Sequence, residues 1–287
     1  AGALGGFGDA DVTERLVRAL GDPAWWVRMR SVEALEQIGQ IAEGPLLVAL
    51  DDPDPEIRSR AAIALERLGV PTRLVSMIDS GERADDARAL LVKFAVAGAR
   101  ELLAELLVHP SARVRLAVVT AIRRTTRRDL ARDVIRAATA DSDAAVRAAA
   151  FDALHALGIR DAVPAALTGM GDAAEPVRTA AIQLLGGVGG ADVAAQLRTR
   201  IADPEPGVRA AAARALGLIH PPDVAADLRR LFSDPGAVVR EAAIAGAADA
   251  GARVLADELV PLLGDADEPV RIAAARALAR IGTAGTV

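Results

Sequence analysis

One block of sequence recurs along the whole chain and constrains its fold more than any other feature. The block consists of Asp-Pro, three variable residues, a Val-Arg pair, an alanine-rich stretch, Ala-Leu and a closing Gly. Early copies run from Asp22 to Gly39 and from Asp52 to Gly69, and from Val146 to Val270 the Val-Arg pair returns every 31 residues. A fixed period of this length is typical of proteins built from stacked repeats.

Each repeat is predicted to consist of two helices. In the block after Asp-Pro the apolar residues follow helical spacing, as in Val146, Ala150, Leu154 and Leu157, so they line one helix face. We expect the Asp of each Asp-Pro to be the N-cap, with the Pro in the first turn, and the closing Gly to end the helix in the left-handed conformation. A shorter apolar helix precedes each block. Helices this short need neighbours for stability, so the repeats must stack.

The period predicts an all-α fold, a right-handed α-solenoid of about nine two-helix repeats forming a single array over residues 1–287. The stretch from Asp79 to Gly98 is predicted to be a degenerate copy without the Val-Arg pair. Residues 1–8 are predicted to be the tail of a preceding repeat. The expected repeats are about 9–39, 40–69, 70–98, 99–126, 127–158, 159–189, 190–220, 221–251 and 252–282.

The two ends of the chain resemble the interior of the array. Residues 3–9 align with the end of a second helix, and the closing repeat, up to Gly282, has ordinary repeat composition where a terminal repeat would carry a polar outer face. We therefore expect either that the chain is a module of a longer protein, or that another subunit covers its ends through end-to-end contacts.

The recurring Asp-Pro, Val-Arg, Ala-Leu and Gly resemble HEAT repeats, in particular the short bacterial variety found in phycobilisome lyases. The resemblance covers essentially the whole chain. It implies that the second helices line a concave surface and that Asp and Arg side chains form a hydrogen-bonded ladder along the stack. The ladder candidates are Asp22, Asp52, Asp141, Asp172, Asp203, Asp234 and Asp265 with Arg28, Arg58, Arg115, Arg147, Arg178, Arg209, Arg240 and Arg271, and His109 stands where the fourth repeat would have its Asp.

Composition excludes several classes of protein. The chain has no Cys, so disulfide scaffolds, thiolate metal sites and cysteine nucleophiles are excluded. Charged residues interrupt every apolar stretch before it could span a membrane. His109, His155 and His220 fall in three different repeats without partners at ligand spacing, so we expect no metal, no cofactor and no catalysis. Among HEAT-like enzymes, deoxyhypusine hydroxylases carry His-Glu steps, and this chain has no His-Glu dipeptide.

The strongest charge feature is the arginine-rich stretch 113–136, which holds eight Arg and only two acidic residues, Asp129 and Asp133. Arg123, Arg124, Arg127 and Arg128 lie at its centre. Guanidinium groups suit carboxylate or phosphate ligands, so an acidic partner is one interpretation. The other is an ordinary solvated face, in which Asp129 and Asp133 pair with Arg132 and Arg136. Nucleic acid is not favoured, because the net charge is −5 and there is no Tyr for base stacking.

Two further groups of residues are candidate contacts. Trp25 and Trp26 occupy positions that other repeats fill with polar or small residues, so they are either binding residues or packed against the preceding repeat. Glu66, Arg67 and His155 lie on the predicted ridge of second helices, which becomes rich in Gly and Ala in the later repeats. These small residues either leave a trough for a partner segment or allow close helix packing.

From these observations we expect a non-catalytic scaffold that binds a protein partner on its concave ridge, with the arginine-rich repeats as the favoured contact. One alternative, implied by the resemblance, is a chromophore lyase of the phycobilin type or a subunit of one. Another is binding of nucleic acid or an acidic partner through residues 113–136. A cytoplasmic location is expected, since the sequence shows no targeting segment.

Overall fold

The computed structural model describes residues 10–125 and 128–282 and contains only helices within them. The described part has eighteen α-helices, joined by short turns and six 3-10 segments, and no strand. The all-α prediction is therefore confirmed. The tail predicted for residues 1–8 lies outside the described residues, as does Arg127. No helix in the described part is long and apolar enough to cross a membrane.

The chain divides into two compact units, and each is treated separately. Unit 1 comprises residues 1–133 and unit 2 residues 134–287. Helices of unit 1 alternate between a first and a second helix in each pair: α1 (Ala10–Ala19), α2 (Trp25–Ile38), α3 (Gln40–Ala49), α4 (Pro55–Arg67), α5 (Val70–Ser80), α6 (Ala84–Ala97), α7 (Arg100–Leu107) and α8 (Ala112–Arg123). The 3-10 segment Arg128–Leu130 follows, and the boundary between the units falls inside α9 (Ala131–Ala140). The prediction of one continuous right-handed array stays a prediction.

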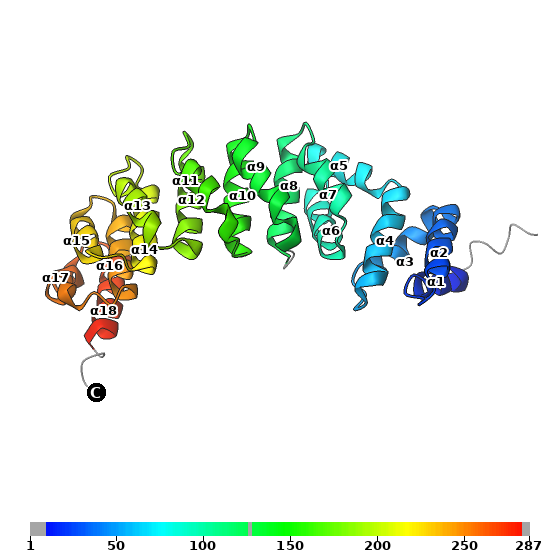
Figure 1. Cartoon of the computed structure of the whole chain (residues 1–287). Coiled ribbons are helices and arrows are strands. Elements are labelled where there is room, and N and C mark those ends of the chain that lie inside the picture. The colour runs from blue at the N-terminus through cyan, green and yellow to red at the C-terminus, as the bar shows by residue number, and fades with distance from the viewer. Residues whose placement is uncertain (1–9, 126–127, 283–287) are drawn as a thin grey trace, which may run out of the picture. The chain divides into compact units, whose positions relative to one another are not determined.

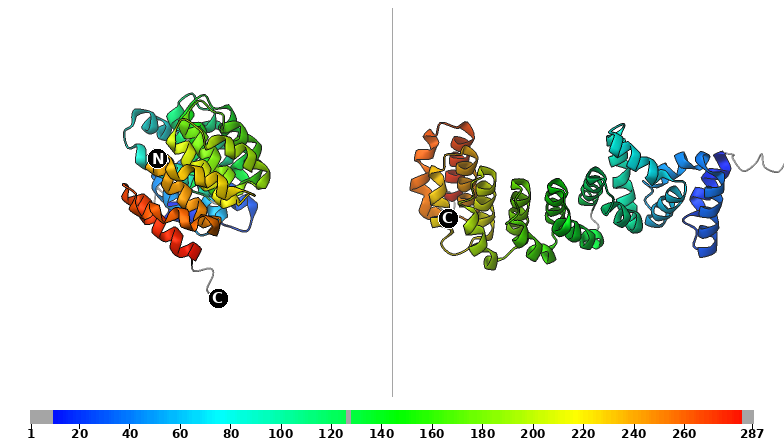
Figure 2. Two further views of the ribbon diagram at one scale, coloured as in Figure 1. Left: turned by 90° about the vertical axis from the view of Figure 1, so that its left-hand side faces the viewer. Right: turned by 90° about the horizontal axis from the view of Figure 1, so that it is seen from above.

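Unit 2 continues the same alternation. Its helices are α10 (Ala144–Ala156), α11 (Val163–Gly169), α12 (Glu175–Val188), α13 (Ala194–Arg200), α14 (Pro206–Ile219), α15 (Val224–Arg229), α16 (Ala237–Asp249), α17 (Ala256–Leu259) and α18 (Glu268–Gly282). Several of its first helices are short and extended by 3-10 turns, as at Arg230–Ser233 and Pro261–Gly264. Figure 1 and Figure 2 show these pairs following one another in chain order.

Stacking of the second helices builds the core of each unit. In unit 2, α10 packs on α12, α12 on α14, α14 on α16 and α16 on α18, and first helices such as α11 and α13 cover their own partners. The recurrent valines, among them Val146, Val177 and Val208, are completely buried. In unit 1, α4 contacts both α2 and α6, and Phe94 of α6 is completely buried. Burial of these apolar faces supplies the stability that the short helices lack alone.

The Asp that opens each of seven blocks, which Pro follows in four of them, has a different role from the predicted N-cap. Its Oδ1 accepts a hydrogen bond of 2.8–3.0 Å from the backbone N–H two residues later, which closes a turn before the helix starts. In the repeat of Asp203, for example, the N-cap is Glu205 and α14 begins at Pro206. The N-cap prediction was therefore wrong by two residues, because an Asx turn satisfies the carboxylate locally.

The recurrent Arg fixes the same turn from inside the helix. In every copy its Nη1 donates to the backbone carbonyls of the residues six and five positions earlier, at 2.7–3.3 Å. In unit 2 the rest of the guanidinium also reaches the next repeat. Its Nε and Nη2 form paired hydrogen bonds of 2.8–3.1 Å in Arg147–Asp172, Arg178–Asp203, Arg209–Asp234 and Arg240–Asp265.

The predicted ladder does not extend through the start of unit 1. The Nε atoms of Arg28 and Arg58 are buried without a hydrogen-bond partner. Asp22 and Asp52 are 30 residues apart, one fewer than the period of unit 2, and no Asp-Pro precedes α6, which follows Arg58. The Asp carboxylate that would accept from Arg28 is therefore displaced by one residue. The one that would accept from Arg58 is missing.

Gly69, Gly158 and Gly251 have the positive φ values, between 61° and 73°, that the closing glycines were predicted to take and that glycine adopts without steric penalty. Gly39 also has a positive φ, 72°, but its ψ of −139° lies outside the left-handed helical region. Gly189 departs from the prediction, since its φ is −72°. His220 replaces the glycine of its repeat and takes the left-handed conformation with φ 52°.

Candidate functional site

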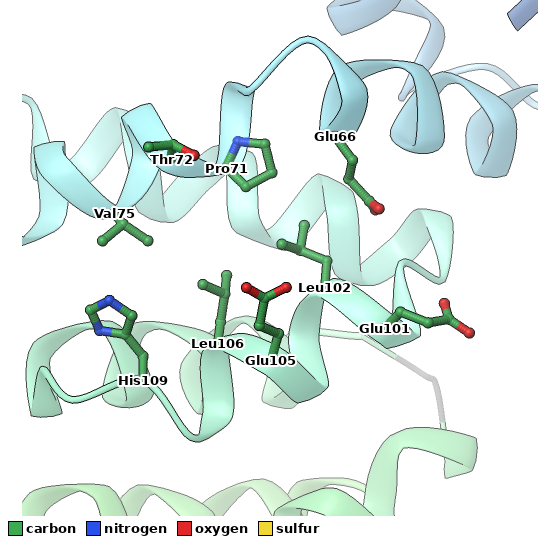
Figure 3. Close-up of a pocket in the computed structure, with 9 residues that line it drawn as sticks. All are labelled: Glu66, Pro71, Thr72, Val75, Glu101, Leu102, Glu105, Leu106 and His109. Carbon is green, nitrogen blue, oxygen red and sulfur yellow. The ribbon is translucent and has the colours of Figure 1, made fainter.

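A pocket of about 400 Å³ opens in unit 1 between the first helices of consecutive repeats. Glu66, at the end of α4, and Pro71, Thr72 and Val75 of α5 form one side. The other side consists of Glu101, Leu102, Glu105 and Leu106 of α7, followed by His109 in the turn before α8. Figure 3 shows the two rows facing each other, with Glu101 and His109 toward opposite ends of the α7 row.

Three carboxylates surround this pocket without basic partners. Glu101 and Glu105 are one helical turn apart on α7, and Glu66 reaches toward them from α4 (Figure 3). Among the residues that the structure describes, none of the three forms an ion pair. Burial of Glu66, reinforced by the charges of Glu101 and Glu105, raises its pKa above the usual range for a glutamate. The site therefore carries negative charge that no residue of the described ranges neutralises by an ion pair.

The floor of the pocket is apolar. Leu102 and Leu106 are almost completely buried, and Val75 and Pro71 are half-buried opposite them. The carboxylates thus stand above a hydrocarbon surface. A ligand that combines a positive charge with an aliphatic stem matches both parts of such a site, because the stem covers apolar surface while the charge stays near the carboxylates.

His109 closes one end of the pocket and is held in a defined orientation. Its Nδ1 accepts a hydrogen bond of 3.1 Å from the backbone N–H of Ser111. This bond requires that Nδ1 be deprotonated, so the neutral ring carries its proton on Nε2. No group of three acidic or histidine side chains within the described ranges has the geometry to hold a metal ion.

The predicted arginine contacts lie at the end of unit 1 and do not line the pocket. Arg123 and Arg124 stand at the end of α8 and Arg128 begins the following 3-10 turn, and all three are exposed. The expected pairing of Asp129 and Asp133 with Arg132 and Arg136 does not form among the described residues. Arg100 of α7 lies 2.8 Å from Asp129 and 4.0 Å from Asp133.

This pairing changes the charge balance of the arginine stretch. Since Arg100 engages both nearby acids, the exposed Arg124, Arg128 and Arg132 have no ion-pair partner within the described part of the chain. We call these three residues the arginine cluster. Other arginines of the stretch are structural, since Arg113 donates to the carbonyl of Asp79 and Arg115 to that of His109.

Trp25 and Trp26 lie in the first turn of α2 and are 47% and 66% exposed. Their rings meet edge to face with centroids 4.5 Å apart. Val27 and Met29 are also partly exposed beside them, so the start of α2 carries a small apolar patch. The preceding repeat against which they were alternatively expected to pack lies outside the described residues.

The ridge residues Glu66, Arg67 and His155 do not form one site. Glu66 turns into the pocket, whereas Arg67 pairs with Glu36 of the preceding repeat at 3.2 Å. His155 belongs to unit 2 and lies over Gly187 of α12, where an added Cβ would come within 2.7 Å of the imidazole Nδ1. Of the predicted contacts, only Glu66 is therefore in the pocket.

The glycines of the later repeats allow close packing between second helices. A Cβ on Gly217 of α14 would lie 2.6 Å from the carbonyl oxygen of Gly246 in α16, and one on Gly186 would lie 2.9 Å from the Cα of Ala215. Of the two interpretations of these small residues, close helix packing fits these contacts. They are core positions between helices and do not line a trough.

Glu101 and Glu105 are the residues of the pocket that sequence reasoning missed. A signal was present: Glu101, Glu105 and His109 recur every four residues, and no Lys or Arg follows either Glu by three or four positions. Two like charges one turn apart destabilise a helix, so such a pair without compensation indicates a role other than stability.

Comparison with known proteins was made by sequence and by structure. A sequence profile of HEAT repeats matches residues 1–66, 99–182, 163–248 and 232–287. A search of curated proteins finds no match. Among solved structures, Escherichia coli YibA is similar with a TM-score of 0.48 and 18% identity, over 94% of this chain and 95% of that one. An engineered protein gives 0.45 and 19%, over 94% and 88%. Human deoxyhypusine hydroxylase, in complex with glycerol, gives 0.38 and 22%, over 84% and 97%.

Proposed function

Because the chain belongs to the HEAT-repeat family, we propose that it is a non-catalytic scaffold for protein partners, and that the acidic pocket of unit 1 receives a cationic side chain of such a partner. The observation that carries this proposal is the set of three carboxylates, Glu66, Glu101 and Glu105, around one pocket, none of which forms an ion pair with another described residue. The fold supports binding, because packed helices hold the site in place before the partner arrives.

The pattern of ion pairs in unit 1 makes these carboxylates distinctive. Acidic residues nearby are matched to bases of adjoining repeats, as in Glu36 with Arg67, or Glu43 with Arg73 at 2.5 Å. The three pocket carboxylates repel one another instead, and this repulsion opposes folding. A guanidinium or ammonium group placed between them would relieve that repulsion. Relief of the repulsion therefore contributes to the free energy of binding.

Arginine fits the site better than a compact cation. Its methylene groups can lie on Leu102, Leu106 and Val75, while its planar group of five donors reaches carboxylates on both sides of the pocket. The volume of about 400 Å³ is at the lower end of the range for ligand sites and holds a long side chain with adjoining backbone. We therefore propose a basic peptide segment as the partner.

Calorimetry with a blocked peptide that contains three arginines tests this proposal. The control peptide has citrulline at the same positions, which preserves shape and removes the charge. We expect the arginine peptide to bind and the citrulline peptide to bind at least tenfold more weakly, since a charge-assisted hydrogen bond contributes about 1.5–3 kcal/mol. Equal affinity of the two peptides, or no binding by either, contradicts the proposal.

Variants distinguish the pocket from the overall negative charge of the chain. Glu66→Gln with Glu105→Gln removes two charges from the pocket and is expected to weaken binding about tenfold or more. The matched control, Glu82→Gln with Asp161→Asn, removes two exposed acidic charges that form no ion pair in the described residues. This control should retain most of the affinity. A similar loss in both double variants would indicate nonspecific attraction and overturn the assignment of the site.

The arginine cluster supports a second candidate contact, for an acidic protein segment. Its support is the engagement of Asp129 and Asp133 by Arg100, which leaves Arg124, Arg128 and Arg132 without acidic partners in the described part. Changing these three arginines to Ala should abolish binding of a glutamate-rich peptide and leave binding of the arginine peptide intact. If a nucleic acid binds instead, with a steep dependence on salt that the triple variant loses, the cluster is a phosphate site.

The lyase alternative has the repeat resemblance as its only support. A lyase would transfer a bilin to an acceptor protein, so incubation of the chain with bilin and a candidate acceptor tests it directly. Formation of a covalent adduct that requires the chain would replace the scaffold proposal, and absence of the adduct would leave the scaffold as the better account.

A further inference from the structure

The turn at His109 departs from a rule that seven of the other repeats follow. In seven repeats an Asp carboxylate accepts the backbone N–H two residues later, and the distances are 2.8–3.0 Å. In the fourth repeat His109 occupies this position, and its Nδ1 accepts the N–H of Ser111 at 3.1 Å. The rest of the turn is unchanged, since Arg115 donates to the carbonyls of His109 and Pro110 at 2.8 and 2.9 Å.

An imidazole and a carboxylate hold this turn with different sensitivity to protons. A carboxylate oxygen remains an acceptor throughout the neutral and mildly acidic range. Nδ1 accepts only while it is deprotonated, and histidine ordinarily gains its second proton between pH 5 and 8. Once protonated, Nδ1 becomes a donor that faces another donor, the N–H of Ser111, so the hydrogen bond is lost.

The charges around His109 give the protonated ring an alternative position. Glu66 approaches from α4, Glu101 and Glu105 from α7, and α5 contributes the uncharged Thr72 and Val75 to the same pocket (Figure 3). On the other side, Arg115 of α8 is bonded to the carbonyl of His109. Asp79, at the end of α5, binds the Ser111 hydroxyl and accepts from Arg113 through its carbonyl. The acids of the pocket therefore attract an imidazolium, while Arg115 and Arg113 repel it.

We propose that His109 is a proton-sensitive latch on the acidic pocket. In its neutral form it holds the turn that starts α8 and leaves the pocket open. In its protonated form it releases Ser111 and turns toward the carboxylates, where its positive charge competes with the cationic side chain of a partner. The binding half of this inference rests on the function proposed above, and the release of Ser111 does not. Basic segments should therefore bind at neutral pH and dissociate on mild acidification.

Hydrogen exchange of the Ser111 amide tests the latch without any ligand. After correction for the intrinsic dependence of exchange on pH, protection of this amide should fall about tenfold between pH 7.5 and 5.5, as expected for loss of one hydrogen bond. The amide of Asp54, which is bonded to the carboxylate of Asp52, is the internal control and should not change. Equal protection of Ser111 at both pH values would overturn the proposal.

The variant His109→Asp installs the residue that seven of the other repeats use. Its turn should persist, and protection of Ser111 should become independent of pH in this range. A fall that persists in His109→Asp would assign the effect to another group and contradict the latch. If His109→Asp fails to fold, NMR of the wild type decides the question. The chemical shifts of the His109 imidazole and of the Ser111 amide are followed through one pH titration. The latch requires that both shifts change together, and independent changes contradict it.

Affinity for the arginine peptide connects the latch to the pocket. In the wild type, affinity should fall several-fold between pH 7.5 and 5.5, and in His109→Asp it should stay nearly constant until the carboxylates themselves protonate at lower pH. An equal fall in both proteins would refute the coupling. If the peptide binds at no pH while Ser111 still responds to protons, the proposed function fails and the latch stands on the exchange data alone.

Discussion

At the scale of single residues, the Arg–Asp ladder of unit 2 is the most regular feature of the molecule. Each rung joins consecutive repeats by two hydrogen bonds, and the same Arg also holds the turn of its own repeat. In the Arg209–Asp234 rung the two side chains are only 13% and 7% exposed. A charge in such a place depends on its partner, because water cannot replace it.

Arg209→Ala should therefore destabilise unit 2 strongly. We expect a loss of about 3 kcal/mol in the free energy of unfolding, since Asp234 would remain buried without its counter-ion. Arg229→Ala is the matched control: Arg229 and Glu258 also form a doubly hydrogen-bonded pair between repeats, but both side chains are well exposed. Its loss should be much smaller. Equal losses in urea denaturation would show that burial does not decide the strength of a rung.

The ladder also predicts a dependence of stability on acid. Hydrogen bonds from Arg147, and the N–H of Ala174, hold the pKa of Asp172 below its usual range. A carboxyl whose pKa is lower in the folded state stabilises the fold above its unfolded pKa, near 4, and loses this contribution as the pH falls through the folded value. The wild type should thus exceed Asp172→Asn in stability at pH 6, and the difference should shrink below about pH 4. A difference that does not change with pH contradicts this assignment.

At this scale the sequence predicted the Arg–Asp ladder, through the resemblance to HEAT repeats, and indicated the wrong local role for the Asp. An Asp before a Pro suits an N-cap by residue preference, but the observed turn places the carboxylate two residues earlier. The choice between an N-cap and an Asx turn depends on backbone angles, which spacing alone does not specify. The missing rung at Arg28 likewise depends on a register difference of one residue between repeats, and the one at Arg58 on the absence of an Asp-Pro before α6.

At the scale of helices, glycine determines how closely α14 and α16 approach. Gly217 and Gly246 bring the two backbones together, and no side chain larger than hydrogen fits between them. The sequence showed small residues here and allowed two interpretations, a partner trough or close packing. Only the distance between the helices, which depends on how consecutive repeats stack, decides between them.

Gly217→Ala should destabilise the α14–α16 contact by about 2 kcal/mol, because its Cβ would meet the backbone of Gly246 and the helices would have to separate. Gly44→Ala in α3 is the control, since a Cβ there meets nothing within 4 Å. That change should be neutral or stabilise by up to about 1 kcal/mol through helix propensity. Thermal unfolding of both variants checks the pair, and a stable Gly217→Ala protein would contradict the close contact.

Unpaired acids on α4 and α7 predict that the pocket reduces the stability of unit 1. Since burial and the two neighbouring glutamates raise the pKa of Glu66, its charge opposes folding at pH 7, and this cost disappears as the pH falls and the group protonates. Glu66→Gln should therefore stabilise unit 1 by about 0.5 kcal/mol at pH 7 and by less near pH 4. Trp fluorescence reports on this unit, because both tryptophans lie in α2. A destabilised Glu66→Gln protein would show that the carboxylate supports the fold.

At the scale of the whole molecule, the repeat period predicted the architecture well and the binding site poorly. Helix pairs follow from a local sequence pattern that recurs in every repeat. A wrong secondary-structure prediction for one copy is therefore corrected by comparison with the others. The pocket instead uses residues from α4, α5 and α7, which belong to three successive repeats and match no recurrent position except that of His109. Departures from the repeat are thus more informative about function than the repeat itself.

The two units differ in how closely they follow the repeat consensus. Unit 2 carries four complete rungs and follows the consensus closely, whereas unit 1 has unsatisfied Arg28 and Arg58 Nε atoms and the unbalanced carboxylates of the pocket. The complete rungs lie in one unit and the candidate site lies in the other. This division is expected when a binding site is built at the expense of internal pairing.

Methyl NMR of the full chain, titrated with the arginine peptide at pH 7.5, tests the central claim most directly. The account predicts that the largest shift changes fall on Val75, Leu102 and Leu106, the aliphatic residues that line the pocket beneath the carboxylates. The citrulline peptide should leave these signals in place. Shift changes confined to methyl groups of unit 2, or none at a saturating peptide concentration, would contradict the account.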